Sequence, residues 1–251
     1  MRSFVKRSLK VMLQSLGYQI ERIVPPIPPD PPGLREIDRK EVEVLADKDF
    51  QRSCQAVASI SFLDISRLAS LWTLCRLTDP TGAIVEIGTY RGGGALHLSN
   101  SAPDRKILVF DPFSEESFED LDPILDGLFS RGQFSGHRKE NVEALLVGRD
   151  VQVVQGFFPA SVADLSLPKI SFVHLDVDVY KATKESLDFL LAPGVLAAKS
   201  LIVIDDYNRR ADGVNKAVSE ALAVVPGTLV FPLFPAQALI VPNTWQSGSV
   251  V

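Results

Sequence analysis

The chain has 251 residues, of which 46% are hydrophobic and 23% are charged, and its formal net charge is -5. This composition is that of a globular protein with one large core, and the acidic balance without a basic stripe argues against nucleic acid as a partner. Cys54 and Cys75 lie among apolar residues and are too few for a disulfide framework, so we expect buried thiols and a cytoplasmic protein.

The first 33 residues differ in composition from the rest of the chain. Residues 1–23 are basic and amphipathic, predict a helix, and lack the uninterrupted apolar segment of a signal peptide. We expect this helix to dock on its own domain or on a second subunit of a homo-oligomer, which we favour over contact with a membrane surface. Residues 25–33, PPIPPDPPG, predict a stiff polyproline connector, and residues 34–251 then form a single domain.

This domain begins with a helical cover, because residues 34–80 carry apolar side chains at helical spacing, as in SRLASLWTLCRL. From residue 81 onward, apolar runs of strand length alternate with amphipathic segments, which predicts an α/β fold with an open, mostly parallel sheet. Five strands are predicted at residues 83–88, 106–111, 151–156, 170–176 and 200–206. Two further apolar runs, 228–234 and 238–243, are joined by PAQ and predict an antiparallel C-terminal hairpin, which makes seven strands.

A glycine-rich turn, in IVEIGTYRGGG, follows the first predicted strand. Glycines let a ligand approach the backbone closely, and the next helix presents free N–H groups. The spacing is not that of a dinucleotide fingerprint, which would need glycine at Tyr90. Glu86 is unfavourable beside a pyrophosphate but suits a cationic ligand such as S-adenosylmethionine. Since the second strand ends in Asp111, where an acid commonly binds a ribose diol, we favour a nucleoside-type cofactor over a merely tight turn.

Two predicted strands each end in a pair of acids, Asp176 with Asp178 and Asp205 with Asp206. A predicted helix at residues 181–192 lies between them, so the strands should be parallel, with their carboxyl ends at the crevice where such sheets bind ligands. Carboxylates crowded at one place repel one another unless a hard cation lies between them. Oxygen ligands suit Mg²⁺, so these acids predict an enzyme site that contains this ion.

These motifs resemble those of the S-adenosylmethionine-dependent macrocin O-methyltransferases, which methylate sugar hydroxyls of natural products, and more distantly those of the catechol O-methyltransferases. The matching stretches are VEIGTYRGGGALHLS, VFDPF, LDVDVYKATKESLDFL and VIDDYNRRADGVNKAV. The resemblance implies a Rossmann-like class I methyltransferase fold and a small-molecule hydroxyl acceptor such as a sugar, a glycan or a phenol. Two features depart from it: APGVLAAKS replaces a Gly-Gly turn before the fifth strand, and Val179 stands where the catechol enzymes place a lysine base.

The same resemblance implies the ligands of the site. Mg²⁺ would be bound by Asp176, Asp205 and Asp206, and residues 34–65 would cover the substrate. The cofactor would be lined by Glu86, Ile87, Gly88, Thr89, Tyr90, Gly93, Asp111 and Asp176. Two vicinal oxygens of the acceptor chelating the metal would lower the pKa of the attacking hydroxyl and fix its angle of attack, and Asp176 could serve as the base.

Other polar residues near these motifs have less certain roles in the sequence. We expect His174, deep in its strand, and His97, on the helix after the glycine turn, to be structural, whereas His137 is a weaker candidate for reaching the crevice. Asp178 could cap the following helix, and we favour a structural or supporting role for it over metal binding. Two residues after the second acidic pair could contact substrate or simply form a turn: Tyr207 and Asn208.

Two other functions compete with methyl transfer. LDVDVY also resembles the D-x-D start of aspartyl-nucleophile phosphatases, in which Asp176 would attack phosphorus and Asp178 would act as acid and base. Against this, the motif follows three strands instead of opening its domain, and Tyr180 stands where threonine or valine is expected. A non-catalytic module that binds the cofactor would keep the same fold, but all three predicted metal acids are present, which argues for chemistry.

Overall fold

The computed structural model describes residues 43–114, 118, 120–207 and 211–245. The chain separates into two compact units, Met1–Arg39 and Lys40–Val251, and all described residues belong to the second. The predicted N-terminal helix, the polyproline connector and Asn208 lie outside the described residues. Among the helices that the structure describes, none combines the length and the apolar character needed to cross a membrane.

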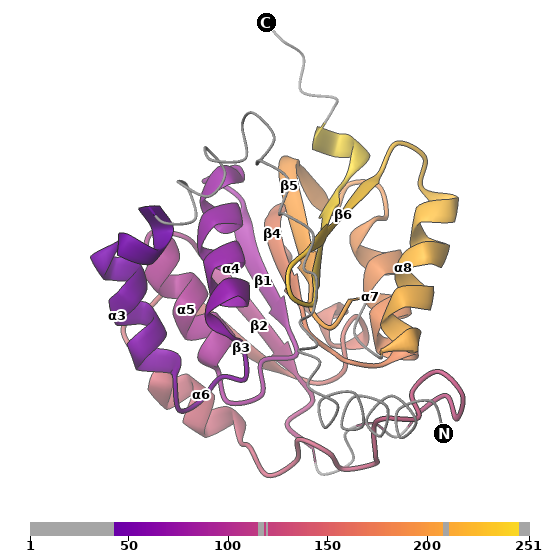
Figure 1. Cartoon of the computed structure of the whole chain (residues 1–251), viewed down its shortest axis with the longest axis horizontal. Helices are drawn as coiled ribbons and strands as arrows, with labels where there is room; N and C mark the ends of the chain where they lie inside the picture. Colours follow the sequence, from indigo (N-terminus) through magenta and orange to yellow (C-terminus); the bar gives the residue numbers. More distant parts are fainter. Residues whose placement is uncertain (1–42, 115–117, 119, 208–210, 246–251) are drawn as a thin grey trace, which may run out of the picture. The chain divides into compact units, whose positions relative to one another are not determined.

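Seven strands form one sheet in the order β3-β2-β1-β4-β5-β7-β6 (Figure 1). Five strands are parallel to one another, and β7 runs antiparallel to both β5 and β6. The strands are β1 (Ala83–Ile87), β2 (Ile107–Asp111), β3 (Val151–Gln155), β4 (Ile170–Leu175), β5 (Leu196–Ile204), β6 (Leu229–Leu233) and β7 (Gln237–Val241). The predicted strands, their parallel arrangement and the C-terminal hairpin are therefore confirmed. Every residue of β1, β2 and β4 is buried, which explains their continuous apolar runs.

Strand β5 begins earlier than predicted, at Leu196 instead of residue 200. The register with β4 gives the reason, because Ile170 pairs with Leu196 whereas Phe172 pairs with Leu201. The fifth strand thus bulges opposite the fourth before the regular ladder resumes. The segment APGVLAAKS, which departs from the family pattern, supplies both the turn and this irregular strand start.

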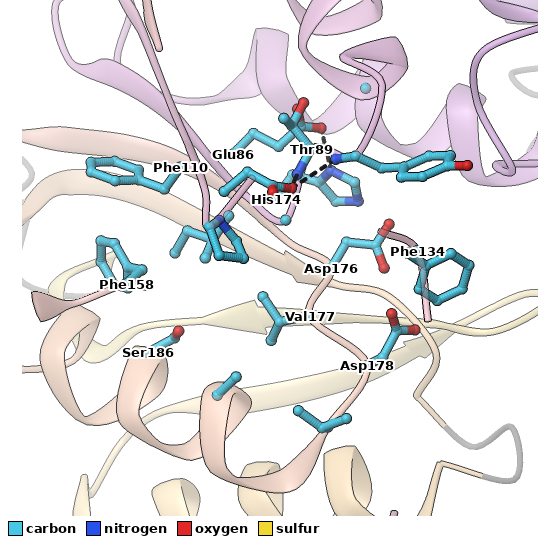
Figure 2. A pocket seen from close by; sticks show the side chains of 18 of the residues that line it. Glu86, Thr89, Phe110, Phe134, Phe158, His174, Asp176, Val177, Asp178 and Ser186 are labelled. Carbon is cyan, nitrogen blue, oxygen red and sulfur yellow. Dashed lines mark hydrogen bonds and ion pairs between the residues drawn. The ribbon is translucent and has the colours of Figure 1, made fainter. Parts of the chain in front are cut away.

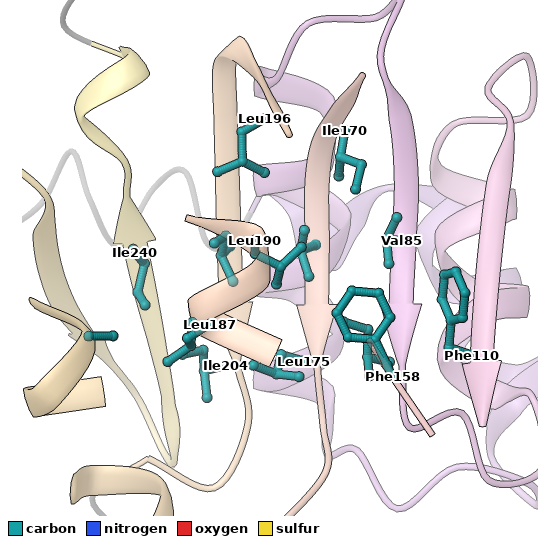
Figure 3. Packing of buried hydrophobic residues seen from close by; sticks show 14 of the residues in the cluster. Val85, Phe110, Phe158, Ile170, Leu175, Leu187, Leu190, Leu196, Ile204 and Ile240 are labelled. Carbon is teal, nitrogen blue, oxygen red and sulfur yellow. The ribbon is translucent and has the colours of Figure 1, made fainter. Parts of the chain in front are cut away.

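Helices cover both faces of the sheet (Figure 1). Alternation along the strands sends Ile84 into a core with the first group of helices, around Trp72, and Val85 into a core with the second group, around Leu187 (Figure 3). The first group is α3 (Lys48–Val57), α4 (Ile65–Leu77), α5 (Gly93–Ser101) and α6 (Lys139–Leu145), and the second is α7 (Tyr180–Leu190) and α8 (Asp212–Val224). The result is a three-layer arrangement whose loops at the carboxyl ends of the parallel strands are free to build a site.

The helical cover predicted at residues 34–80 is interrupted. Helices α3 and α4 are separated by residues 58–64, which are not helical. Each helix starts at an aspartate whose carboxylate accepts backbone N–H groups: Asp47 caps α3 and Asp64 caps α4. These two capping residues are the sequence signals that divide the segment, since a capping aspartate marks a helix start.

Candidate functional site

A cavity of about 700 Å³ lies at the carboxyl ends of the parallel strands. Its wall is built from the loops after β1, β2, β3 and β4, from the start of α7, and from the turn between α3 and α4 (Figure 2). All residues predicted to line the cofactor lie on this wall: Glu86, Ile87, Gly88, Thr89, Tyr90, Gly93, Asp111 and Asp176. This is the crevice in which open α/β sheets bind ligands.

The turn after β1 has a backbone that only glycine accepts at its first position. Gly88 has a φ of +85°, and a Cβ there would overlap the carbonyl oxygen of Asp176. Tyr90 and Gly92 also have positive φ values, of 52° and 83°, so the chain winds tightly before α5 begins. The turn therefore packs closely against the loop after β4 and presents the amino end of α5 to the cavity.

Glu86 lies in the cavity wall but is tied to other protein groups. It is paired in register with His174 on β4, and its Oε1 lies 2.9 Å from His174 Nδ1. The hydroxyl of Thr89 donates to its Oε2, and a Cβ on Gly94 would overlap its Oε1. Since Glu86 is only 1% exposed, its carboxylate fixes the turn and the histidine as well as facing the cavity.

The carboxylate of Asp111 accepts four hydrogen bonds. The backbone N–H groups of Thr89 and Tyr90 donate to Oδ2 at 3.0 and 2.9 Å. Oδ1 accepts from the backbone of Phe113 at 2.9 Å and lies 2.8 Å from His137 Nε2. His137 therefore lines the cavity, although the sequence made it only a weak candidate for reaching the crevice. It is also the side chain that contacts Asp111.

The acids at the ends of β4 and β5 form two overlapping groups. In one group, ligand atoms of His174, Asp176 and Asp205 lie within 4.8 Å of one another, and in the other those of Asp176, Asp178 and Asp206 do so. Asp176 and Asp206 line the cavity, whereas Asp205 is fully buried. Asp176 thus belongs to both groups, but Asp205 and Asp206 belong to different ones, so neither group contains all three predicted metal acids. Asp178, which was not predicted to bind metal, lies near Asp176 (Figure 2).

Asp178 does not cap the next helix. The N-cap residue of α7 is Val179, and the backbone N–H of Tyr180 donates instead to Oδ1 of Asp126, at 2.9 Å. Asp178 and Asp206 both have positive φ values, of 63° and 56°, which aspartate tolerates better than most residues. Strained backbone at two positions of one acidic group indicates that the orientation of these carboxylates is important for the site.

Burial and mutual repulsion act together on these acids. Burial is the main cause that raises the pKa of Asp176 well above its usual value, and the neighbouring Asp205 adds to it. Burial and the charge of Asp176 raise the pKa of Asp178 in the same way. Protons or a cation are therefore needed to stabilise this end of the sheet.

His174 lies between Glu86 of the glycine turn and Asp205 of the acidic group. Its Nδ1 contacts Glu86, and its Nε2 is 3.6 Å from Asp205 Oδ2, an ion-pair distance rather than a hydrogen bond. Burial opposes the charged ring, but the carboxylates of Asp205 and Glu86 raise the pKa of His174 to about 10. The histidine is buried and hydrogen-bonded, as predicted, yet it belongs to the site. His97, by contrast, is structural as expected: its ring nitrogens lie 2.8 Å from Ser53 Oγ and 3.0 Å from a backbone carbonyl.

Sequence reasoning missed Arg67, in the first turn of α4. Its Nη1 donates to Asp205 Oδ1 at 2.9 Å, and its Nη2 donates to the carbonyl of Phe62 at 2.7 Å. The side chain is 12% exposed and lines the cavity. An arginine on an amphipathic helix gives no sign that it will reach a residue 138 positions away, so only the capping Asp64 hinted that a structured turn lay here.

Comparison with known proteins agrees with this geometry. The profile of the macrocin-O-methyltransferase (TylF) family matches residues 65–223, more than half of the chain. A search of curated proteins finds no match.

Several solved structures share the fold. The O-methyltransferase NovP superposes with a TM-score of 0.61 at 19% identity, covering 73% of this chain and 82% of its own. The calicheamicin methyltransferase CalS11 gives 0.56 at 21% identity, covering 89% and 98%. The S-adenosylhomocysteine-bound methyltransferase PaMTH1 of Podospora anserina gives 0.52 at 16% identity, covering 86% and 98%. These neighbours confirm the class I methyltransferase fold, and the family assignment favours methyl transfer over the phosphatase alternative. The chain belongs to the macrocin-O-methyltransferase (TylF) family and is an S-adenosylmethionine-dependent O-methyltransferase.

Proposed function

We propose that this enzyme methylates a hydroxyl of a sugar, or of another small molecule with vicinal hydroxyls, using a divalent cation bound by Asp176, Asp205 and Asp206. The observation that carries the proposal is the group of carboxylates beside the glycine turn, on the wall of one cavity. The macrocin-O-methyltransferase family to which the chain belongs favours such an acceptor.

The cavity suits S-adenosylmethionine for two reasons. The amino end of α5 presents N–H groups to the cavity at Gly93 and Gly94, where the methionine end would lie. Asp111 stands at the end of β2, where the hydroxyls of a ribose diol would donate to its carboxylate in place of His137. Glu86 would act on the cofactor chiefly by holding the glycine turn in place, and its negative charge would also favour a cationic ligand.

The donor set suits a hard divalent cation. Asp176, Asp178 and Asp206 offer only oxygen atoms, within 4.8 Å of one another, which is the ligand type that Mg²⁺ prefers. Burial, with the neighbouring acids adding to it, raises the pKa of Asp176 and Asp178, so a cation at this place would stabilise their ionised forms. In the proposed set Asp205 supplies the remaining carboxylate from behind the cavity wall.

In the proposed reaction the side chains orient and deprotonate the acceptor. When bound, S-adenosylmethionine supplies the electrophilic methyl group, and a divalent cation supplies charge that favours the ionised hydroxyl. Asp176 would accept the hydroxyl proton at a carboxylate oxygen, a role that its raised pKa suits. The cavity wall would hold the acceptor hydroxyl in line with the methyl group that the cofactor supplies.

The test is methyl transfer from tritiated S-adenosylmethionine to rhamnosides and catechols, with Mg²⁺ or with EDTA. We expect EDTA, and separately Asp176→Asn, to lower the rate at least about 100-fold, while calorimetry shows little change in S-adenosylhomocysteine affinity. Asp164→Asn, which changes an exposed carboxylate outside the cavity, serves as the matched control. Undiminished transfer by Asp176→Asn, or wild-type protein that binds no S-adenosylhomocysteine, would contradict the proposal.

A further inference from the structure

The carboxylate of Asp205 accepts three hydrogen bonds, two of them at Oδ1. Its Oδ1 accepts from Arg67 and from the backbone N–H of Asp206, both at 2.9 Å. Its Oδ2 accepts from Gln237 Nε2 at 3.4 Å and lies 3.6 Å from His174 Nε2. A carboxylate oxygen offers about two acceptor positions, so a metal ion can bind Oδ1 only by displacing Arg67 or the N–H of Asp206.

Arg67 is the group that can be displaced. The N–H of Asp206 belongs to the backbone that follows β5, Gln237 starts β7, and His174 lies within β4, so all three are fixed by the sheet. Arg67 instead reaches Asp205 on a long side chain from α4, outside the sheet. It is also the permanently charged partner, so its departure is compensated when another cation arrives.

The position of Arg67 also connects Asp205 to the segment between α3 and α4. Its Nε lies 3.3 Å from Asp64 Oδ2, and its Nη2 holds the carbonyl of Phe62. The ring of Phe62 stacks on Tyr90 of the glycine turn, with 5.5 Å between centroids. A movement of Arg67 would therefore shift Phe62, near the carboxyl end of the predicted substrate cover at residues 34–65.

We propose that Arg67 is the cation that occupies Oδ1 of Asp205 in the metal-free enzyme and competes with the divalent cation for this carboxylate. This inference rests on the proposed function, since it concerns the same ion. In the metal-free state Arg67 neutralises Asp205 and holds Phe62 against the turn. Metal binding releases the guanidinium from Asp205, so each cation weakens the binding of the other to this carboxylate.

Calorimetric titration of the full-length enzyme with Mg²⁺ alone tests the competition. In Arg67→Met we expect Mg²⁺ to bind at least about fivefold more tightly than in wild type, because the competitor is gone. Arg76→Met is the matched control: it removes one arginine from the same helix, away from the cavity, and should leave the affinity unchanged. A weaker or equal affinity in Arg67→Met would overturn the proposal, since Arg67 would then orient Asp205 or be irrelevant to it.

A second variant and a second measurement cover the case in which Arg67→Met folds poorly. Arg67→Lys keeps the charge but loses the fork that joins Asp205 to Phe62, so Mg²⁺ should bind more tightly than in wild type and more weakly than in Arg67→Met. Thermal unfolding of both variants in EDTA should show a lowered Tm that Mg²⁺ restores by a larger shift than in wild type. An equal Mg²⁺-induced rise in Tm in the variants and in wild type would overturn the competition between Arg67 and the metal ion, but not the metal site itself. No response to Mg²⁺ in any of the proteins would instead refute the metal role in the proposed function.

Discussion

The two ends of the parallel sheet solve the problem of buried charge in opposite ways. At the amino end, Arg105 is 8% exposed and its guanidinium is surrounded by neutral acceptors. It donates to the carbonyls of Gly82 and Cys75, to the hydroxyl of Thr78 at 3.0 Å, and to the hydroxyl of Ser171. One charge is therefore shared among many hydrogen bonds, which joins α4 to β1 and β4.

At the carboxyl end the charges outnumber their partners. Asp176 and Asp178 have raised pKa values because they are buried and lie beside other acids. The polar groups at the amino end stabilise the fold, whereas those at the carboxyl end are arranged to bind and release a ligand. Charged groups are buried at both ends, so the repulsion between neighbouring acids, more than burial, distinguishes the functional end of this sheet.

The largest effect on stability is expected at the amino end. Arg105→Met leaves several buried oxygen atoms without their donor, so the free energy of unfolding should fall by at least about 3 kcal/mol in urea denaturation. Arg52→Met is the control, because this side chain is 73% exposed, and it should change the stability by no more than about 0.5 kcal/mol. Similar losses in the two variants would show that Arg105 does not anchor this end.

A pH dependence should appear at the other end. The pKa of His174 is raised from 6.5 to about 10 in the folded protein, so its stabilisation is complete below pH 6.5 and is lost as pH rises toward 10. In EDTA, the stability of wild type should fall relative to His174→Gln over this interval, by up to about 1.4 kcal/mol per pH unit. His97→Gln is the control, since the pKa of His97 is about 4 and this ring stays neutral there. Parallel curves for wild type and His174→Gln would refute the charged state of His174.

A smaller effect, of opposite sign, is expected for Asp178. Asp178→Asn removes one charge from the acidic group and should stabilise the metal-free protein by about 1 kcal/mol. The gain should shrink as pH falls toward the usual aspartate pKa of 3.8, because protonation relieves the wild type as well. Chemical denaturation in EDTA measures both, and the exposed Asp164→Asn should show no gain. A loss of stability in Asp178→Asn would mean that the carboxylate is already compensated.

Much of this organisation could be predicted from local patterns. Continuous apolar runs located the strands, and acids at the ends of two neighbouring strands were bound to meet because parallel strands end at one edge. What local patterns could not supply were contacts made across the sequence: Arg67 with Asp205, and Asp126 with the start of α7. The bulge in β5 was missed for the same reason, since register depends on the neighbouring strand.

Anomalous scattering from crystals of the enzyme grown with Mn²⁺ and S-adenosylhomocysteine tests whether the acids at the carboxyl end bind a divalent cation inside the cofactor cavity. We expect one strong peak among Asp176, Asp205 and Asp206, with Arg67 turned away from Asp205 and the ligand beside Gly88. A crystal that holds the ligand but shows no peak at these carboxylates would contradict this expectation.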